Sequence, residues 1–110
     1  PGYERFIIRP QPGGRLQWAR TEYHSIRGPI AVHWELKDDA LNLDIRVPAN
    51  TVANVHVPLG EEQTLTESGS TLISGGSPVS KTFDGVRDVQ IVDGSAVLEV
   101  GSGEYSFVAR

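Results

Sequence analysis

The sequence predicts an all-β domain, an antiparallel β-sandwich of jelly-roll-like arrangement built from eight or nine short strands. Three observations lead to this fold class. Apolar and polar side chains alternate along 30–36, 41–47 and 53–57, and a period of two buries one face of a strand while the other stays in water. Clusters of Gly, Pro, Asn and Asp separate the runs, as turns require. No segment shows the period of about 3.6 residues of an amphipathic helix, which favours a sandwich.

Residues 28–58 are the most regular part of this pattern. They predict three strands in up-and-down order, joined by short turns at Asp38-Asp39 and Pro48-Ala49-Asn50. Trp34 and Ile45 lie on the apolar side of the alternation. We therefore expect both side chains in the core.

Two further strands are expected before this region. Residues 5–9 form the first, and it ends at 10–14 because prolines cannot donate ladder hydrogen bonds. Residues 16–25 form the second, with apolar side chains on both sides of the alternation. We expect this strand to be partly covered on both faces, as it would be beneath a neighbouring domain.

The C-terminal half begins with a less regular segment. Residues 60–85 are rich in Ser, Thr and Gly and are expected to form long loops with one or two short strands, near 64–66 and 71–73. Three strands follow, at 86–92, 96–100 and 104–109. Asp93-Gly94 predicts a type I′ hairpin, because Gly accepts the positive φ of that turn. Gly101-Ser102-Gly103 is expected to form the last hairpin turn.

Composition limits the possible functions. A chain of 110 residues without cysteine fits a single domain, residues 1–110, that needs neither a disulfide nor a thiolate zinc site. The net charge of −4 and the pI near 5.2 argue against nucleic acid or an anionic membrane as partner. No apolar run approaches the roughly 20 residues of a membrane span, and no signal-peptide pattern opens the chain. Because the chain starts at Pro1-Gly2, we expect a fragment of a longer protein.

Few residues of this sequence are candidates for catalysis or metal binding. His24, His33 and His56 lie on three different predicted strands or strand edges, without the close spacing of zinc ligands, and the last two have outward parity. Asp38-Asp39 occupies a hairpin turn, where aspartate is favoured for local backbone hydrogen bonds. A Gly-x-Ser-x-Gly nucleophile motif is absent from the sequence. The residues therefore predict no catalytic, cofactor-binding or metal-binding site.

Motifs spread over nearly the whole chain resemble one family. They are residues 8–14 with Leu16 and Trp18-Ala19, Ile30 to Trp34 after Gly28, residues 47–51 leading into 55–58, and residues 100–103 with Tyr105 and Phe107. In this order and spacing they resemble the C-terminal domain of bacterial α-L-rhamnosidases, glycoside hydrolases with an (α/α)6-barrel catalytic domain. Pro29 departs from the family pattern, and residues 70–85 match no part of it.

The resemblance implies the C-terminal fragment of an enzyme that removes terminal α-L-rhamnosyl groups with inversion. The catalytic carboxylates of such enzymes lie on the barrel, upstream of this segment, so no catalytic residue is carried over and the fragment alone is expected to be inactive. The implied partners are the catalytic domain of the same chain and, through it, a rhamnose-containing glycan. We expect an accessory domain that packs on the barrel and stabilises it. The alternative is a carbohydrate-binding module with its own sugar site, and a cytoplasmic or secreted location stays open.

The contact surface with the barrel is expected at the strand 16–25, because it lacks a clean alternation. Trp18, Tyr23, His24 and Arg27 are the predicted interface residues, since aromatic and arginine side chains are enriched at interface cores. His24 or Arg27 would reach the rim of the substrate cleft. The alternative places Trp18 in the sandwich core and leaves the other three on an ordinary surface.

Overall fold

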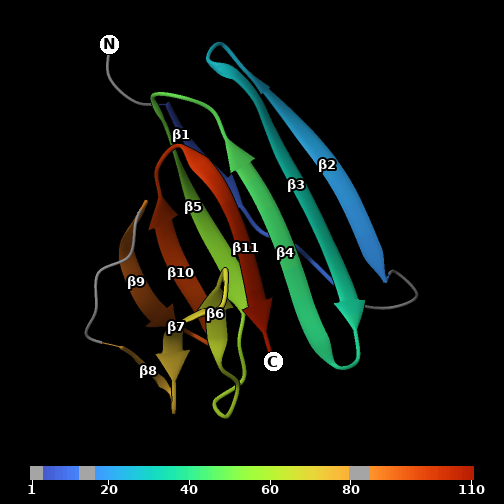
Figure 1. The fold of residues 1–110 in the computed structure, drawn as a ribbon, viewed down its shortest axis with the longest axis vertical. Helices are drawn as coiled ribbons and strands as arrows, with labels where there is room; N and C mark the ends of the chain where they lie inside the picture. Colours follow the sequence, from blue (N-terminus) through green and yellow to red (C-terminus); the bar gives the residue numbers. More distant parts are fainter. Residues whose placement is uncertain (1–3, 13–16, 80–84) are drawn as a thin grey trace.

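The computed structural model describes residues 4–12, 17–79 and 85–110, and these form eleven strands in two facing sheets (Figure 1). The strands are β1 (Glu4–Ile8), β2 (Trp18–Ser25), β3 (Gly28–Lys37), β4 (Ala40–Val47), β5 (Thr51–Pro58), β6 (Leu65–Glu67), β7 (Ser70–Ser74), β8 (Ser77–Pro78), β9 (Val86–Val92), β10 (Ser95–Val100) and β11 (Gly103–Ala109). No helix occurs in these described ranges, and hence none that could cross a membrane. The predicted all-β sandwich is confirmed.

The two sheets differ in width. The larger sheet has seven strands in the order β2-β3-β4-β11-β6-β7-β8, and the smaller has four in the order β1-β5-β10-β9. All pairs in these sheets are antiparallel except β1 and β5, which run parallel. Strand β2 forms one edge of the larger sheet (Figure 1), and most of its residues are exposed.

The hydrophobic core fills the space between the sheets. Trp34 and Ile45 are 5% and 3% exposed, so both predicted core positions are confirmed. They join one buried cluster with residues of the smaller sheet such as Val55 and Leu98. Because both sheets contribute apolar inner faces, the chain holds a core of its own.

The predicted three-strand meander is wrong at its last step. Strands β3 and β4 pair as expected, with Lys37 opposite Ala40. Strand β5, however, belongs to the smaller sheet, between β1 and β10. Asn50 adopts a φ of 56° just before β5, where the chain leaves the larger sheet. Alternation shows which side of a strand is buried, but it does not show which strand becomes its neighbour.

The segment Gly101-Ser102-Gly103 is likewise not a hairpin turn, as the sequence predicted. It carries the chain from β10 in the smaller sheet to β11 in the larger one. The Tyr105 hydroxyl donates to the carbonyl oxygen of Gly101 at 2.9 Å, and the amide of Gly101 donates to Gly85 at 2.9 Å. This contact resembles the tyrosine corner of other sandwich folds, where a tyrosine hydroxyl ties down a crossing a few residues upstream. Burial is the main cause that raises the pKa of Tyr105, and the Glu67 carboxylate adds to it.

Two-residue turns close most of the hairpins. Asp93 and Gly94 have φ values of 46° and 79°, which confirms the predicted type I′ turn between β9 and β10. Asp38-Asp39 has the same signature, with φ values of 52° and 61°. Similar pairs at Ser68-Gly69 and Gly75-Gly76 connect β6, β7 and β8, so the described part of 60–85 holds three short strands where one or two were expected.

Trp34 offers a direct test of the core. Replacing it with alanine is expected to lower the free energy of unfolding by roughly 3–5 kcal/mol, because a large buried ring leaves a cavity. Denaturant melts of the purified chain measure this. A loss below about 1 kcal/mol would contradict the burial of the ring.

The second stability prediction concerns the crossing held by Tyr105. A Cβ added at Gly85 would lie 2.1 Å from the Tyr105 hydroxyl oxygen, whereas one at Gly94 meets no atom within 4 Å. Their φ values, 81° and 79°, are nearly equal. Gly94→Ala should therefore cost only the backbone strain, about 1–2 kcal/mol, and Gly85→Ala a further ~1–3 kcal/mol from the steric clash. Equal losses in urea melts of the two variants would show that Tyr105 does not hold the crossing.

Candidate functional site

A hollow of about 490 Å³ lies on the outer face of the seven-stranded sheet. It is lined by Arg20, Ala31, Val32, His33, Asp44, Ile45, Arg46, Ser68, Glu104, Tyr105 and Ser106. These residues come from four adjacent strands, β2, β3, β4 and β11, and from the turn after β6. The hollow is therefore a feature of the assembled sheet and not of one segment.

A small residue at the centre explains the space. Ala31 stands opposite Glu22 on one side and Arg46 on the other. Two positions further along β3, His33 stands opposite Arg20 and Asp44. Because directly opposed residues share a face, the methyl group of Ala31 leaves a depression among longer side chains. The backbone of three neighbouring strands forms its floor.

Charged groups of both signs border the depression. Arg46 donates from Nε to Glu104 Oε1 at 2.9 Å, and a second nitrogen of the same guanidinium also contacts that oxygen. Both side chains are 69% exposed, so this ion pair adds little to stability. Asp44 lies beside them, between His33 on β3 and Ser106 on β11. The site presents hydrogen-bond donors and acceptors next to each other.

Trp18 stands at one end of the hollow. Its side chain is 58% exposed, so the alternative that placed it in the sandwich core is wrong. The ring meets His33 edge-on, with centroids 6.4 Å apart and an interplanar angle of 72°. Edge-to-face contact is a favoured aromatic arrangement, and it fixes the indole beside the hollow.

The structure does not bring the four predicted interface residues together. Trp18 and His24 share the outer face of β2, but they are six residues apart, roughly 20 Å along a strand. Tyr23 points to the opposite face, where it lines a smaller hollow of about 270 Å³ with Pro10, Gln11 and others. Arg27 lies in the β2–β3 turn, where its amide donates to Ser25 Oγ at 3.1 Å. Tyr23, His24 and Arg27 thus gather at one end of β2, and Trp18 lies at the other.

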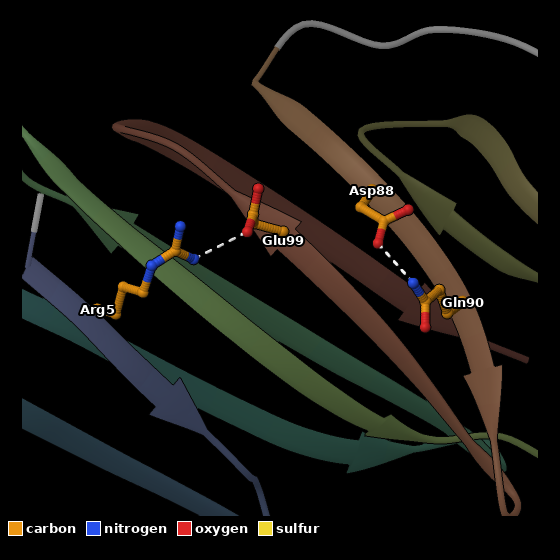
Figure 2. A network of polar contacts seen from close by, with 4 residues as sticks. All are labelled: Arg5, Asp88, Gln90 and Glu99. Atoms are coloured by element: carbon orange, nitrogen blue, oxygen red, sulfur yellow. Dashed lines mark hydrogen bonds and ion pairs between the residues drawn. The ribbon is translucent and has the colours of Figure 1, made fainter.

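The outer face of the smaller sheet has a different character. Figure 2 shows Arg5 on β1 directed at Glu99 on β10, at 2.9 Å, and Gln90 on β9 directed at Asp88, at 2.8 Å. His56 also lies on this face, lining a hollow of about 420 Å³ with Arg9. Partial burial and, secondly, the Arg9 charge lower the pKa of His56 below its usual 6.5. Polar pairs occupy the centre of this face, and among its described residues no exposed Trp, Tyr or Phe lies beside them.

Neither face assembles a recognisable catalytic or metal centre from the described residues. No group of three or more His, Cys, Asp or Glu side chains that could hold a metal ion occurs within 4–12, 17–79 and 85–110. The sequence did not indicate the hollow either. The alternation along β4 shows that Asp44 and Arg46, two residues of the hollow, point outward. Their neighbours Glu104 and Ser106 follow only from the pairing of β4 with β11.

Known proteins with similar sequences point to one family. The profile of the bacterial alpha-L-rhamnosidase C-terminal domain matches residues 1–71, more than half of the chain. An alpha-L-rhamnosidase of Streptomyces avermitilis is 32% identical over 106 residues, which are 96% of this chain and 9% of that protein. One of Formosa agariphila is 30% identical over 74 residues, or 67% of this chain and 8% of that protein.

Solved structures agree with the sequence comparison. The alpha-L-rhamnosidase from Dictyoglumus thermophilum superposes with a TM-score of 0.76 at 28% identity, over 94% of this chain and 11% of that one. The Streptomyces avermitilis enzyme complexed with L-rhamnose gives 0.72 at 30% identity, over 99% of this chain and 9% of that one. The chain spans about a tenth of the length of these proteins. With this sandwich and these motifs, the chain belongs to the bacterial α-L-rhamnosidase C-terminal domain family.

Proposed function

We propose that this chain is a non-catalytic accessory domain that packs on the catalytic barrel of an α-L-rhamnosidase-like enzyme and stabilises it. The observation that carries this proposal is the coverage: the chain aligns over nearly its whole length with about a tenth of the α-L-rhamnosidases of Streptomyces avermitilis and Dictyoglumus thermophilum. The parent enzyme would hydrolyse terminal α-L-rhamnosyl groups with inversion. In that reaction one carboxylic acid protonates the leaving oxygen and a carboxylate activates water, and both groups would come from the barrel.

The closed core supports an accessory role over an enzymatic one. The inner faces of both sheets bury each other in one apolar cluster, and among the described residues no carboxylate lines the hollow of about 270 Å³ at the β2 edge of this layer. The charged side chains that the structure describes are all at least partly exposed, so water screens them. This chain's own part in hydrolysis would therefore be to hold the barrel in place.

The end of β2 offers a surface for that contact. Ile26, in the β2–β3 turn, is 87% exposed, and Tyr23, two residues before the end of β2, is 38% exposed. The turn is preorganised, because Ser25 Oγ donates to the Gly28 carbonyl at 2.7 Å. Exposed apolar groups gathered on an ordered turn are typical of interaction sites. We place the docking surface at Tyr23, His24, Ile26 and Arg27, with Trp18 outside it.

The isolated chain is expected to fold but not to hydrolyse aryl α-L-rhamnosides, because the paired carboxylates of the proposed mechanism lie outside it. A chromogenic rhamnoside assay at high protein concentration measures this. Turnover that survives repurification, and that Glu67→Gln or Asp39→Asn abolishes, would overturn the accessory role.

Ile26 provides a test of the docking surface. In the full-length parent enzyme, Ile26→Ser should remove roughly 1–3 kcal/mol of stabilisation, the value of burying such a side chain. It should also lower the melting temperature of the barrel. In the isolated chain the same change should leave melting unaltered, because the side chain is already in water.

Val92→Ser serves as the matched control, since Val92 is an apolar residue at another hairpin and is 47% exposed. It should not change barrel melting in the full-length enzyme. If Ile26→Ser and Val92→Ser give the same melting curves, the barrel contacts a different surface.

A further inference from the structure

The hollow on the outer face of the larger sheet is not used by the docking surface just described. It lies around Ala31 and His33, in the middle of β3, whereas Tyr23, Ile26 and Arg27 lie at the end of β2. We propose that this hollow binds a neutral saccharide, with Trp18 as an aromatic platform at its end. This second site goes beyond the proposed function and does not depend on it, because the chain forms the hollow by itself.

The charged side chains around the hollow favour a neutral ligand over an anionic one. Arg20 and Arg46 supply two positive charges, and Asp44 and Glu104 supply two negative ones. Glu22 and Glu67 add further negative charge beside the hollow, so a phosphate or a carboxylate ligand would meet more repulsive than attractive groups. A polyhydroxyl ligand is matched differently, because each hydroxyl both donates and accepts. It can bind guanidinium and carboxylate groups side by side.

The hydroxyl groups in the lining extend this match. Ser68 Oγ donates to the Glu67 carboxylate, which leaves the serine oxygen free to accept. The amide of Ser106 donates to the same carboxylate at 3.2 Å, so this end of the hollow is ordered by the protein itself. Preorganised polar groups reduce the entropy lost on binding, which matters for a small, flexible ligand.

Size and apolar surface fit as well. A volume of about 490 Å³ lies within the roughly 300–1,000 Å³ of small-molecule sites. Pyranose rings have an apolar C–H face as well as hydroxyls, and the partly negative face of an aromatic ring attracts such hydrogens. Trp18 offers this face, since 58% of its surface is exposed and His33 holds the ring edge-on. A sugar in the hollow, or the next unit of a glycan, can stack there.

The other two hollows lack this combination. The one of about 420 Å³ beside His56 is lined by Asp93 and Arg9 but by no Trp, Tyr or Phe of the described residues. The one of about 270 Å³ contains Tyr23 and Trp34 but no carboxylate. Of these three hollows, the one around Ala31 combines donors and acceptors with an exposed tryptophan, which adjoins it through the contact of Trp18 with His33.

Amide NMR shifts and tryptophan fluorescence of the chain test the proposal, with methyl α-L-rhamnopyranoside, maltotriose and inorganic phosphate as probes. At least one saccharide should bind with about millimolar affinity and shift the amides of residues 31–33, 44–46 and 104–106, while phosphate should not. Fluorescence should report the exposed Trp18, since Trp34 is 5% exposed.

Two variants and one control define the site. Trp18→Ala and Asp44→Asn should each weaken saccharide binding about tenfold. Asp88→Asn makes the same chemical change on the outer face of the smaller sheet (Figure 2) and should leave binding unchanged. The spectra of all variants must show the native fold, which their exposed positions favour.

The proposal fails if no saccharide shifts these amides, if phosphate binds there more tightly, or if Asp88→Asn weakens binding as much as Asp44→Asn. It also fails if no saccharide binds and the full-length enzyme protects residues 31–33 from amide exchange, because the hollow is then an interdomain contact. The accessory role is judged separately, by the melting of the full-length Ile26→Ser variant.

Discussion

Mutual burial of the two inner sheet faces is the constraint on which the rest of this structure depends. The larger sheet contributes Trp34 and Phe107, and the smaller contributes Val55 and Leu98, to one buried cluster. Neither apolar face could remain in water, because removing apolar surface from water is the main driving force for folding. Seven strands face four, and β2, at the edge of the larger sheet, leaves most of its residues exposed. Surfaces for contacts beyond this core therefore occur along β2 and on the outer faces.

The chain reaches this arrangement by crossing between the sheets, and the crossings also build the outer surface. Because β5 leaves the larger sheet, β4 has a free edge to which β11 can pair. That pairing places Glu104 beside Arg46, which is 58 residues away in sequence. Tyr105, the residue after Glu104, points inward and ties the crossing to Gly101. The same short strand thus holds the fold with one side and borders the candidate site with the other.

The two outer faces have distinct properties although both are polar. On the smaller sheet, Arg5 with Glu99 and Asp88 with Gln90 form pairs over the strands (Figure 2). On the larger sheet, Ala31 interrupts the long side chains and leaves a hollow beside an exposed tryptophan. Surface ion pairs such as Arg5 with Glu99 and Arg46 with Glu104 contribute little to stability. Both faces are free to take part in contacts with other molecules.

The sequence by itself determined the local features: the positions of most strands, the inward direction of Trp34 and Ile45, and the type I′ turn at Asp93-Gly94. The family was also readable, because its motifs recur in order along most of the chain. Only the tertiary structure decided that β5 joins the smaller sheet and that Asp44 and Arg46 lie beside β11. It also separated Trp18 from Tyr23 and Arg27, which sequence proximity had grouped. The physical reason is that side-chain alternation and turn geometry act over a few residues. The choice of neighbouring strand depends instead on how distant segments share one core.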